Sequence, residues 1–116
     1  MVPTIYLAGP DVFLANALEV GRRKCELCRQ FGFEGLFPLD LGPAKEDAAE
    51  IFRANWSLMR RADIGLFNLT PFRGSSADAV TVFELGFMFA QDKRVYGYTS
   101  VPRPYREKVE TGYGPL

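Results

Sequence analysis

Apolar and polar residues follow one another along the chain in blocks that predict strands and helices in turn. Short apolar runs predict strands, and longer segments with an apolar residue at every third or fourth position predict amphipathic helices. The tail, residues 102–116, has no such period and is predicted to be a loop or flap. The predicted strands cover residues 4–8, 33–39, 64–69 and 94–98, and the predicted helices cover residues 15–30, 45–62 and a segment from Ala79 or Thr81 to Gln91.

This β-α-β-α-β-α-β order predicts an α/β fold. Short connections between alternating elements require parallel strands joined by right-handed crossovers, which give a doubly wound, flavodoxin-like or Rossmann-like sheet with helices on both faces. By analogy with flavodoxin-like proteins, we expect the strand order 2-1-3-4. With 116 residues, no internal repeat and no linker, the chain is expected to form a single domain.

The carboxyl ends of the predicted strands gather the polar residues that could bind a ligand, because α/β folds bind ligands at that edge. Glu84 is expected there, in the first turn of the third helix, with Asp78 six residues before it. The other residues at this edge are Gly9, Pro10, Asp11, Asp40 and residues 70–74, with Tyr6 nearby on the first strand.

Glu84 has two interpretations. Two carboxylates at the start of one helix suit glycosidic chemistry, in which one carboxylate attacks or stabilises an oxocarbenium-like sugar. The positive end of the helix would keep Glu84 ionised for that role. Alternatively, Thr81-x-x-Glu84 matches a capping box, in which the glutamate only caps the helix. Asp78 likewise fits a plain loop or cap residue, and Tyr6 fits a core position.

Composition narrows the chemistry. The 14 basic and 14 acidic residues balance to a formal net charge of +0, which gives no reason to expect nucleic acid or a membrane surface as a partner. The absence of His removes Ser-His and Cys-His pairs and the commonest metal ligand, so we expect no metal and no cofactor. The chain has no leader-like start and no run near the roughly 20 apolar residues of a membrane span, so a cytoplasmic protein is expected.

Three further features have structural and functional interpretations. Cys25 and Cys28 form a C-x-x-C, which fits a redox pair or half a metal site, but without a second pair the favoured interpretation is two reduced thiols on one helix face. The basic residues 22–24 and Arg29 are expected on a solvated helix face. The loop from Arg73 to Ser76 lacks the P-loop pattern and is predicted to be a lid, and Asp63 is expected to make a structural hydrogen bond.

Together, these residues resemble the nucleoside 2-deoxyribosyltransferase family, and its protozoan-type members most closely. The resemblance covers essentially the whole chain. It rests on Ile5-Tyr6-Leu7-Ala8-Gly9-Pro10 with Phe13, on Asn55 followed by Ala62-Asp63-Ile64, and on Leu69-Thr70-Pro71-Phe72-Arg73-Gly74 leading to Asp78 and to Thr81-Val82-Phe83-Glu84-Leu85-Gly86.

The resemblance implies a ping-pong transfer of 2-deoxyribose between nucleobases, with slow hydrolysis as a side reaction. Glu84 would be the nucleophile that forms a covalent sugar ester, Tyr6 would orient it, and Asp78 would bind the sugar hydroxyls. The expected partners are a 2'-deoxynucleoside and a free nucleobase. The expected substrate-binding residues are Gly9, Pro10, Phe13, Asp40, Asn55, Pro71, Phe72, Arg73 and Gly74.

This chain departs from the family pattern at two places. Some members have Asp where this chain has Asn55, which leaves the group that protonates the leaving base unassigned. The family also continues beyond the position of Leu116, with an Asn that completes a neighbouring subunit's sugar pocket and then a strand and a helix. The resemblance therefore implies a homo-oligomer, a dimer or larger, with shared sites.

Two rival functions stay open. A 2'-deoxynucleoside 5'-monophosphate N-glycosidase would share the fold and the catalytic glutamate but needs a phosphate site. Asp11 in the first loop would repel a phosphate, whereas Arg73, Ser75 and Ser76 could bind one. The second rival is a nucleoside-binding domain without catalysis, in which Glu84 only caps its helix.

Overall fold

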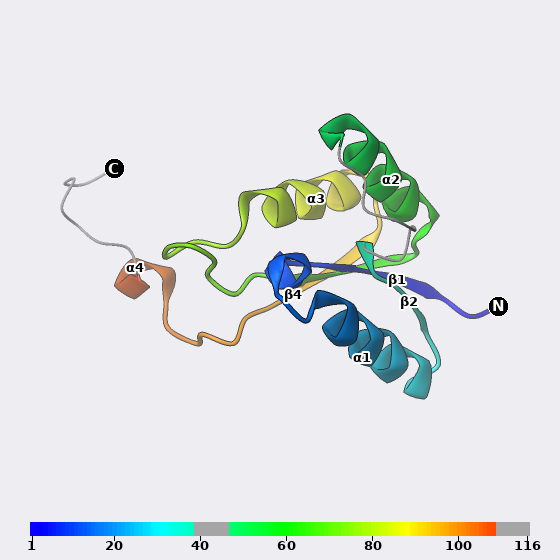
Figure 1. The fold of residues 1–116 in the computed structure, drawn as a ribbon, viewed down its shortest axis with the longest axis horizontal. Helices are drawn as coiled ribbons and strands as arrows, with labels where there is room; N and C mark the ends of the chain where they lie inside the picture. Colours follow the sequence, from blue (N-terminus) through cyan, green and yellow to red (C-terminus); the bar gives the residue numbers. More distant parts are fainter. Residues whose placement is uncertain (39–46, 109–116) are drawn as a thin grey trace.

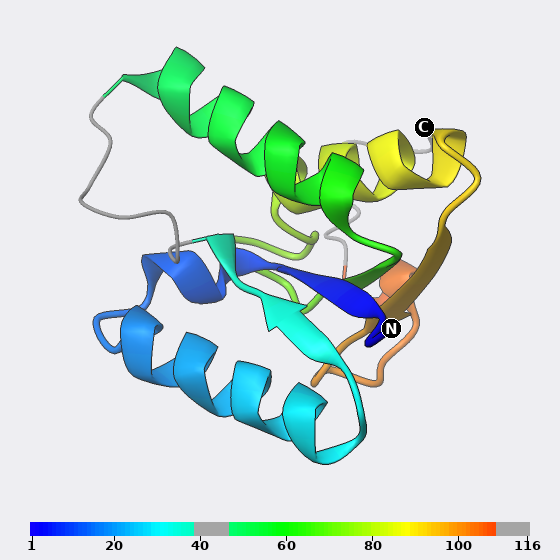
Figure 2. The ribbon, with the colours of Figure 1, turned by 90° about the vertical axis from the view of Figure 1, so that its right-hand side faces the viewer.

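The protein is described here by a computed structural model that covers residues 1–38 and 47–108 (Figure 1). The strands form one all-parallel sheet in the order β2-β1-β3-β4. Helices α2 and α3 cover one face of this sheet and α1 covers the other (Figures 1 and 2). The predicted fold class and strand order are therefore confirmed. The elements are β1 (Thr4–Ala8), η1 (Pro10–Phe13), α1 (Ala17–Gln30), β2 (Glu34–Leu36), α2 (Ala48–Arg61), β3 (Ile64–Asn68), α3 (Ala79–Ala90), β4 (Arg94–Tyr98) and α4 (Tyr105–Lys108).

The differences from the predicted elements are short and local. β2 has three residues rather than seven, and α1 begins two residues later than expected. η1 is a 3-10 turn in a segment predicted to be a loop, because Pro10 favours the start of such a turn. The segment predicted as loop or flap contains one helical turn, α4.

The core lies between the sheet and the α2–α3 layer. β1 is central, with β2 on one side and β3 on the other, so Tyr6, Leu7 and Ala8 are all buried. Tyr6 and Ala8 form one buried cluster with Phe67 from β3. The remaining members are Leu36, Leu58, Met59, Ala62 and Met88. A tyrosine in such a core requires a hydrogen-bond partner for its hydroxyl. Tyr6 has this partner in Glu84 of α3.

The amino ends of the strands carry structural hydrogen bonds. Asp63 Oδ2 accepts hydrogen bonds from the Thr4 amide at 2.9 Å and from the Thr4 hydroxyl at 3.1 Å, as predicted for a structural residue. Lys93 Nζ donates to three backbone carbonyls at the end of α2, those of Met59, Arg60 and Ala62, at 2.6 to 2.7 Å. A cation at a helix carboxyl terminus neutralises the negative end of the helix dipole.

No helix within the described residues is long and apolar enough to cross a membrane.

Candidate active site

A cavity of about 320 Å³ opens at the carboxyl edge of the sheet, where η1 meets α2 and the first half of α3. A volume of this size suits a small molecule. The wall is mostly apolar and its described part includes no Lys or Arg, while its polar groups come from Asn55, Asp78, Thr81 and Glu84. The apolar and backbone wall is formed by Gly9, Val12, Phe13, Pro38, Ile51 and Val80.

Glu84 and Tyr6 meet at the inner end of this cavity. Tyr6 has no exposed surface and Glu84 has 6% of its surface exposed. The Tyr6 hydroxyl donates a hydrogen bond of 2.7 Å to Glu84 Oε2. The expected contact between these two residues is therefore present, and it joins the central strand to the helix that covers it.

The protonation of Glu84 differs from the expectation. Burial raises the pKa of Glu84 to about 7, and the nearby charge of Asp78 also raises it, whereas the hydrogen bond from Tyr6 favours the carboxylate. The expectation that the helix terminus would keep Glu84 fully ionised is wrong, because desolvation dominates here. The pKa of Tyr6 is raised far above its usual value by burial and by Glu84, so its hydroxyl stays a donor.

Asp78, and not Thr81, caps α3. Asp78 Oδ2 accepts hydrogen bonds from the Thr81 amide at 3.0 Å and from the Thr81 hydroxyl at 2.9 Å. The helix therefore begins at Ala79, which puts Glu84 in the second turn rather than the first. The capping-box interpretation of Glu84 is wrong for this reason. Asp78 is a cap residue and also lines the cavity beside Glu84.

An aromatic stack includes one residue of the cavity wall. Phe13 lines the cavity and stacks on Phe72 with a centroid distance of 5.2 Å. The Arg73 guanidinium lies over both rings, 4.6 Å from Phe72 and 5.4 Å from Phe13. Arg73 itself has a left-handed backbone, with a φ of 53°, and Gly74 follows with a φ of 150°. The 70–76 loop thus reaches the cavity through Phe13.

The expected substrate-binding residues divide into four groups. Gly9, Phe13 and Asn55 line the cavity. Pro10 is buried in η1 behind it. Asp40 lies outside the described residues. The four loop residues Pro71, Phe72, Arg73 and Gly74 are not part of the cavity wall, and two of them contact it through Phe13.

Some wall residues were not predicted from the sequence. Val12, Pro38, Ile51 and Val80 supply apolar surface, and Thr81 lies beside the cap of α3. Their positions in the sequence could have identified them, because each lies within four residues of a predicted site residue. Ile51, for example, is one helical turn before Asn55, and Val80 is two residues after Asp78.

Two predictions about charged residues near the cavity are wrong. Lys24 is not on a solvated face, because its Nζ pairs with Asp11 Oδ2 at 2.8 Å. Asp11 does not present a free charge that would repel a phosphate, because Lys24 neutralises it and it is not part of the cavity wall.

No described part of the chain groups three or more His, Cys, Asp or Glu side chains as a metal site. The two cysteines form no disulfide and sit half-buried on α1. Cys25 Sγ lies 3.6 Å from the Gly35 carbonyl on β2, and burial raises the pKa of Cys28. These facts agree with the helix-face interpretation of the pair, since a raised pKa lowers thiol reactivity.

Comparison with known proteins agrees with the geometry. The sequence profile described as Nucleoside 2-deoxyribosyltransferase matches residues 5–114. An uncharacterized protein of Schizosaccharomyces pombe is 39% identical over 118 residues, covering 95% of this chain and 56% of that protein. The chain therefore spans little more than half the length of that relative.

Solved structures share the fold. The 2-desoxiribosyltransferase from Leishmania mexicana matches with a TM-score of 0.82 and 32% identity, over 91% of this chain and 70% of that one. A 2-deoxyribosyltransferase from Bacillus psychrosaccharolyticus matches with a TM-score of 0.70 and 20% identity, over 87% and 75% of the two chains. A conserved protein from Enterococcus faecalis V583 gives 0.69 and 24%, over 86% and 65%. The last two matches support the fold alone.

Proposed function

The chain belongs to the nucleoside 2-deoxyribosyltransferase family, as its motifs predicted, and we propose that it transfers 2-deoxyribose from a 2'-deoxynucleoside to a free nucleobase. The observation that supports this most directly is the buried pair of Tyr6 and Glu84 in a cavity of about 320 Å³. The related structure from Leishmania mexicana is named a 2-desoxiribosyltransferase, which supports the same class of reaction for this chain.

In the proposed first step, Glu84 attacks the anomeric carbon C1' of the sugar. Tyr6 binds Oε2, which leaves Oε1 for the attack. A new bond forms between C1' and this oxygen, the C1'–N bond breaks, and its electron pair goes to the base nitrogen, which takes up a proton as the base leaves.

In the second step, a nitrogen of the incoming base attacks C1' of the sugar ester. The bond between C1' and the Glu84 oxygen breaks, its electrons return to the carboxylate, and the incoming base loses a proton. Water in place of a base gives slow hydrolysis. A pKa of about 7 lets Glu84 ionise near neutral pH while it stays a better nucleophile than a strongly stabilised carboxylate.

The other cavity residues would hold the substrate. Asp78, beside Glu84, would accept hydrogen bonds from sugar hydroxyls. Asn55 would hydrogen-bond the base from α2, but a carboxamide cannot donate a proton, so the proton for the leaving base comes from elsewhere. Phe13 offers an aromatic wall, stiffened by Phe72 and Arg73.

We also propose that the protein works as a homo-oligomer. α2 and α3 present three exposed aromatic rings, those of Phe52, Trp56 and Phe83. Phe52 contacts Phe83, and the partly buried Phe87 contacts both Phe83 and Trp56. Ile51 and Val80 continue this apolar surface into the cavity wall. An exposed apolar patch of this kind is typical of an interaction surface.

A slow 2-fluoro analogue of a 2'-deoxynucleoside tests the mechanism. Mass spectrometry of the intact protein should show the mass of one fluorinated sugar, and peptide mapping should place it on Glu84. Glu84→Gln is the matched control, because it keeps the size and the acceptor for Tyr6 but should gain no adduct. An adduct on another residue would contradict the assignment, and turnover without an adduct in wild type would contradict the covalent mechanism.

One observation favours a second candidate, the 2'-deoxynucleoside 5'-monophosphate N-glycosidase. Arg73 lies over the ring of Phe13, which lines the cavity, so it could contact a phosphate of a bound nucleotide. Against it, the described cavity wall has no cationic side chain. Assays with deoxyinosine plus adenine, and separately with deoxynucleoside monophosphates, distinguish the two. Transfer of the sugar to adenine supports the transferase, whereas base release from monophosphates alone would replace it by the glycosidase.

A further inference from the structure

A group of four polar side chains lies behind the cavity wall and joins four elements at the carboxyl edge. We call it the edge clamp: Asp11 in η1, Lys24 in α1, Asn68 at the end of β3 and Tyr98 at the end of β4. Asp11 Oδ2 accepts from Lys24 Nζ at 2.8 Å, and Asp11 Oδ1 accepts from Asn68 Nδ2 at 3.0 Å. Lys24 Nζ also lies 2.6 Å from the Tyr98 hydroxyl. None of the four lines the cavity.

Partial burial makes the edge clamp stronger than a surface ion pair. The side chains of Asp11 and Lys24 are 11% and 27% exposed, whereas those of the Arg23–Glu19 pair on the same helix are 74% and 53% exposed. Burial opposes the charges, but Lys24 and Asn68 still hold the pKa of Asp11 below its usual value. Asp11 and Tyr98 likewise hold the pKa of Lys24 above its usual value, so both groups stay charged near neutral pH.

Asp11 holds one wall of the cavity through its place in the chain. It lies in η1 between Gly9 and Phe13, which both line the cavity. The packing of η1 on β3 is tight, because a Cβ at Gly9 would lie 2.6 Å from Asn68 Cβ and 2.7 Å from Asp11 Oδ1. The positive φ of Gly9, 154°, also excludes other residues there.

Asn68 holds the loop that packs against this wall. Its Oδ1 accepts the Thr70 amide at 3.1 Å, which fixes the start of the loop that carries Phe72. Phe72 in this loop stacks on Phe13, so the loop also contacts η1. The Asp11 carboxylate is therefore connected to both rings of the Phe13–Phe72 stack.

We infer that Asp11 is a positioning residue, which, through Lys24 and Asn68, fixes the Phe13 wall and the loop of Phe72 in the arrangement that binds the nucleoside. It touches no reacting atom, so its loss should weaken substrate binding and leave the chemical step largely intact. The effect on binding rests on the proposed function; the effect on the two loops does not.

Hydrogen exchange measures the effect on the loops without any substrate. In Asp11→Asn, the amides of Leu14, Thr70 and Phe72 should exchange about tenfold faster, because their hydrogen bonds lie in the two segments that the clamp holds. The amides of β1 and β3 should keep wild-type rates. Unchanged exchange at all three amides, or an equal increase in both strands, would overturn the inference.

Kinetics test the effect on binding. Asp11→Asn should raise KM for the deoxynucleoside by about tenfold and change kcat by less than about threefold, as expected for an interaction that acts on binding alone. A fall in kcat with an unchanged KM would overturn the positioning role. If the wild type transfers no sugar, the proposed function fails while the exchange result still decides whether the clamp exists.

Matched variants separate the clamp from general stability. Arg23→Gln breaks an exposed ion pair on the same helix and should change neither exchange nor KM. Lys24→Arg should have a KM close to that of the wild type. Lys24→Met should raise KM and speed amide exchange as Asp11→Asn does. If Asp11→Asn does not fold, Tyr98→Phe removes only the hydroxyl that meets Lys24 and should give a smaller change in the same direction.

Discussion

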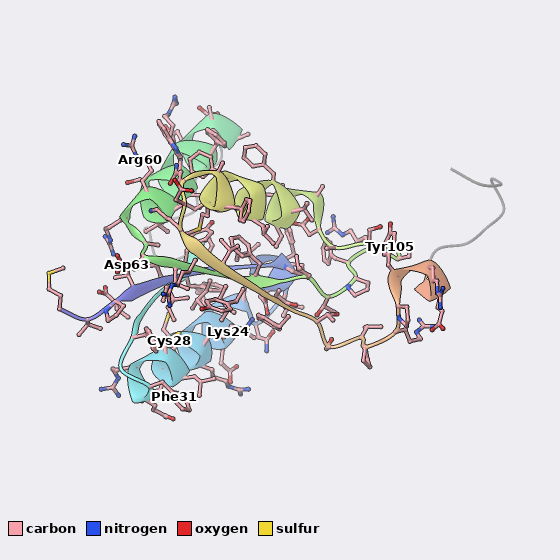
Figure 3. All side chains as sticks on the ribbon, turned by 180° about the vertical axis from the view of Figure 1, so that it is seen from behind. Lys24, Cys28, Phe31, Arg60, Asp63 and Tyr105 are labelled. Atoms are coloured by element: carbon pink, nitrogen blue, oxygen red, sulfur yellow. The ribbon has the colours of Figure 1, made fainter. Side chains whose placement is uncertain are left out.

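Two residues of strand β1, Thr4 and Tyr6, hold two carboxylates in opposite ways. At the amino end, Thr4 donates two hydrogen bonds to Asp63, which is exposed. Two residues further along the strand, Tyr6 donates one hydrogen bond to Glu84, which is buried. Figure 3 labels Asp63 at the end of the sheet near the amino terminus, whereas Tyr105 lies beyond the opposite, carboxyl edge.

The two carboxylates differ in their exposure to solvent and in the number of hydrogen bonds that they accept from β1. The hydrogen bonds from Thr4 hold the pKa of Asp63 below its usual value, whereas burial raises the pKa of Glu84 to about 7. Asp63 is thus a stable structural anion. Glu84 is kept as a poorly solvated carboxyl group, which costs folding free energy and favours reaction. Groups with such perturbed pKa values in a cleft are typical of active sites.

Replacing the buried carboxylate should give the largest effect. Glu84→Gln should lower sugar transfer by roughly 10³-fold or more, because the proposed nucleophile is removed while the amide keeps the shape and the contact to Tyr6. The measurement is the rate of exchange between deoxyinosine and adenine. Turnover near the wild-type rate would show that Glu84 is not the nucleophile.

The same variant should be more stable than the wild type above neutral pH. The pKa of Glu84 is about 7 in the folded chain and 4.5 as the usual value, so folding takes up a proton between these pH values and wild-type stability falls as pH rises through them. At pH 8, Glu84→Gln should be more stable by up to about 3 kcal/mol, with little difference near pH 4. Urea unfolding at both pH values measures this, and equal stability at pH 8 would contradict the raised pKa.

Removing the donor should give an intermediate effect. Tyr6→Phe loses a hydrogen bond to a charged group, which is worth about 1.5–3 kcal/mol, so kcat/KM should fall by about 10- to 150-fold. Because that hydrogen bond favours the carboxylate, its loss should move the acid limb of the pH profile above the wild-type value of about 7. Tyr96→Phe, on the exposed part of β4, is the control. It should change neither kcat/KM nor the position of the acid limb of the pH profile.

The smallest effect is expected at the amino end. Asp63→Asn should leave transfer unchanged and lower Tm slightly at pH 7. Because the folded pKa of Asp63 is depressed, its contribution exists above pH 3.8 and is lost as pH falls below that value. Thermal unfolding at pH 7 and near pH 3 tests the sign. A rate loss as large as that of Tyr6→Phe would show that the two carboxylates along the strand are not independent.

The fold could be predicted because its signals are local. The apolar run of β1 and the three-to-four spacing on α2 each report their own element, and alternation of the elements then fixes a parallel sheet. The exact ends of the helices and strands were harder to predict. At α3, both Asp78 and Thr81 are good cap residues, so the sequence left a helix start at Ala79 or Thr81 open, and the hydrogen bonds of Asp78 decide for Ala79.

The site could be predicted only in part, because its energetics depend on distant partners. Tyr6 and Glu84 are 78 residues apart, and the burial that raises the pKa of Glu84 exists only after the sheet and α3 pack together. The pairing of Lys24 with Asp11 was missed for a related reason: a lysine within a basic cluster resembles a solvated residue until the strand ends bring a carboxylate to it.

Trp56 has a consequence for measurement. It is the single tryptophan of the chain and lies on α2 next to Asn55 of the cavity wall, 38% exposed, under the Arg60 guanidinium and edge-on to Phe87. All indole fluorescence of the protein therefore comes from one ring, which contacts Phe87 and Arg60 on the α2–α3 layer. Its emission reports on that layer alone, without a label and against a background free of other indoles.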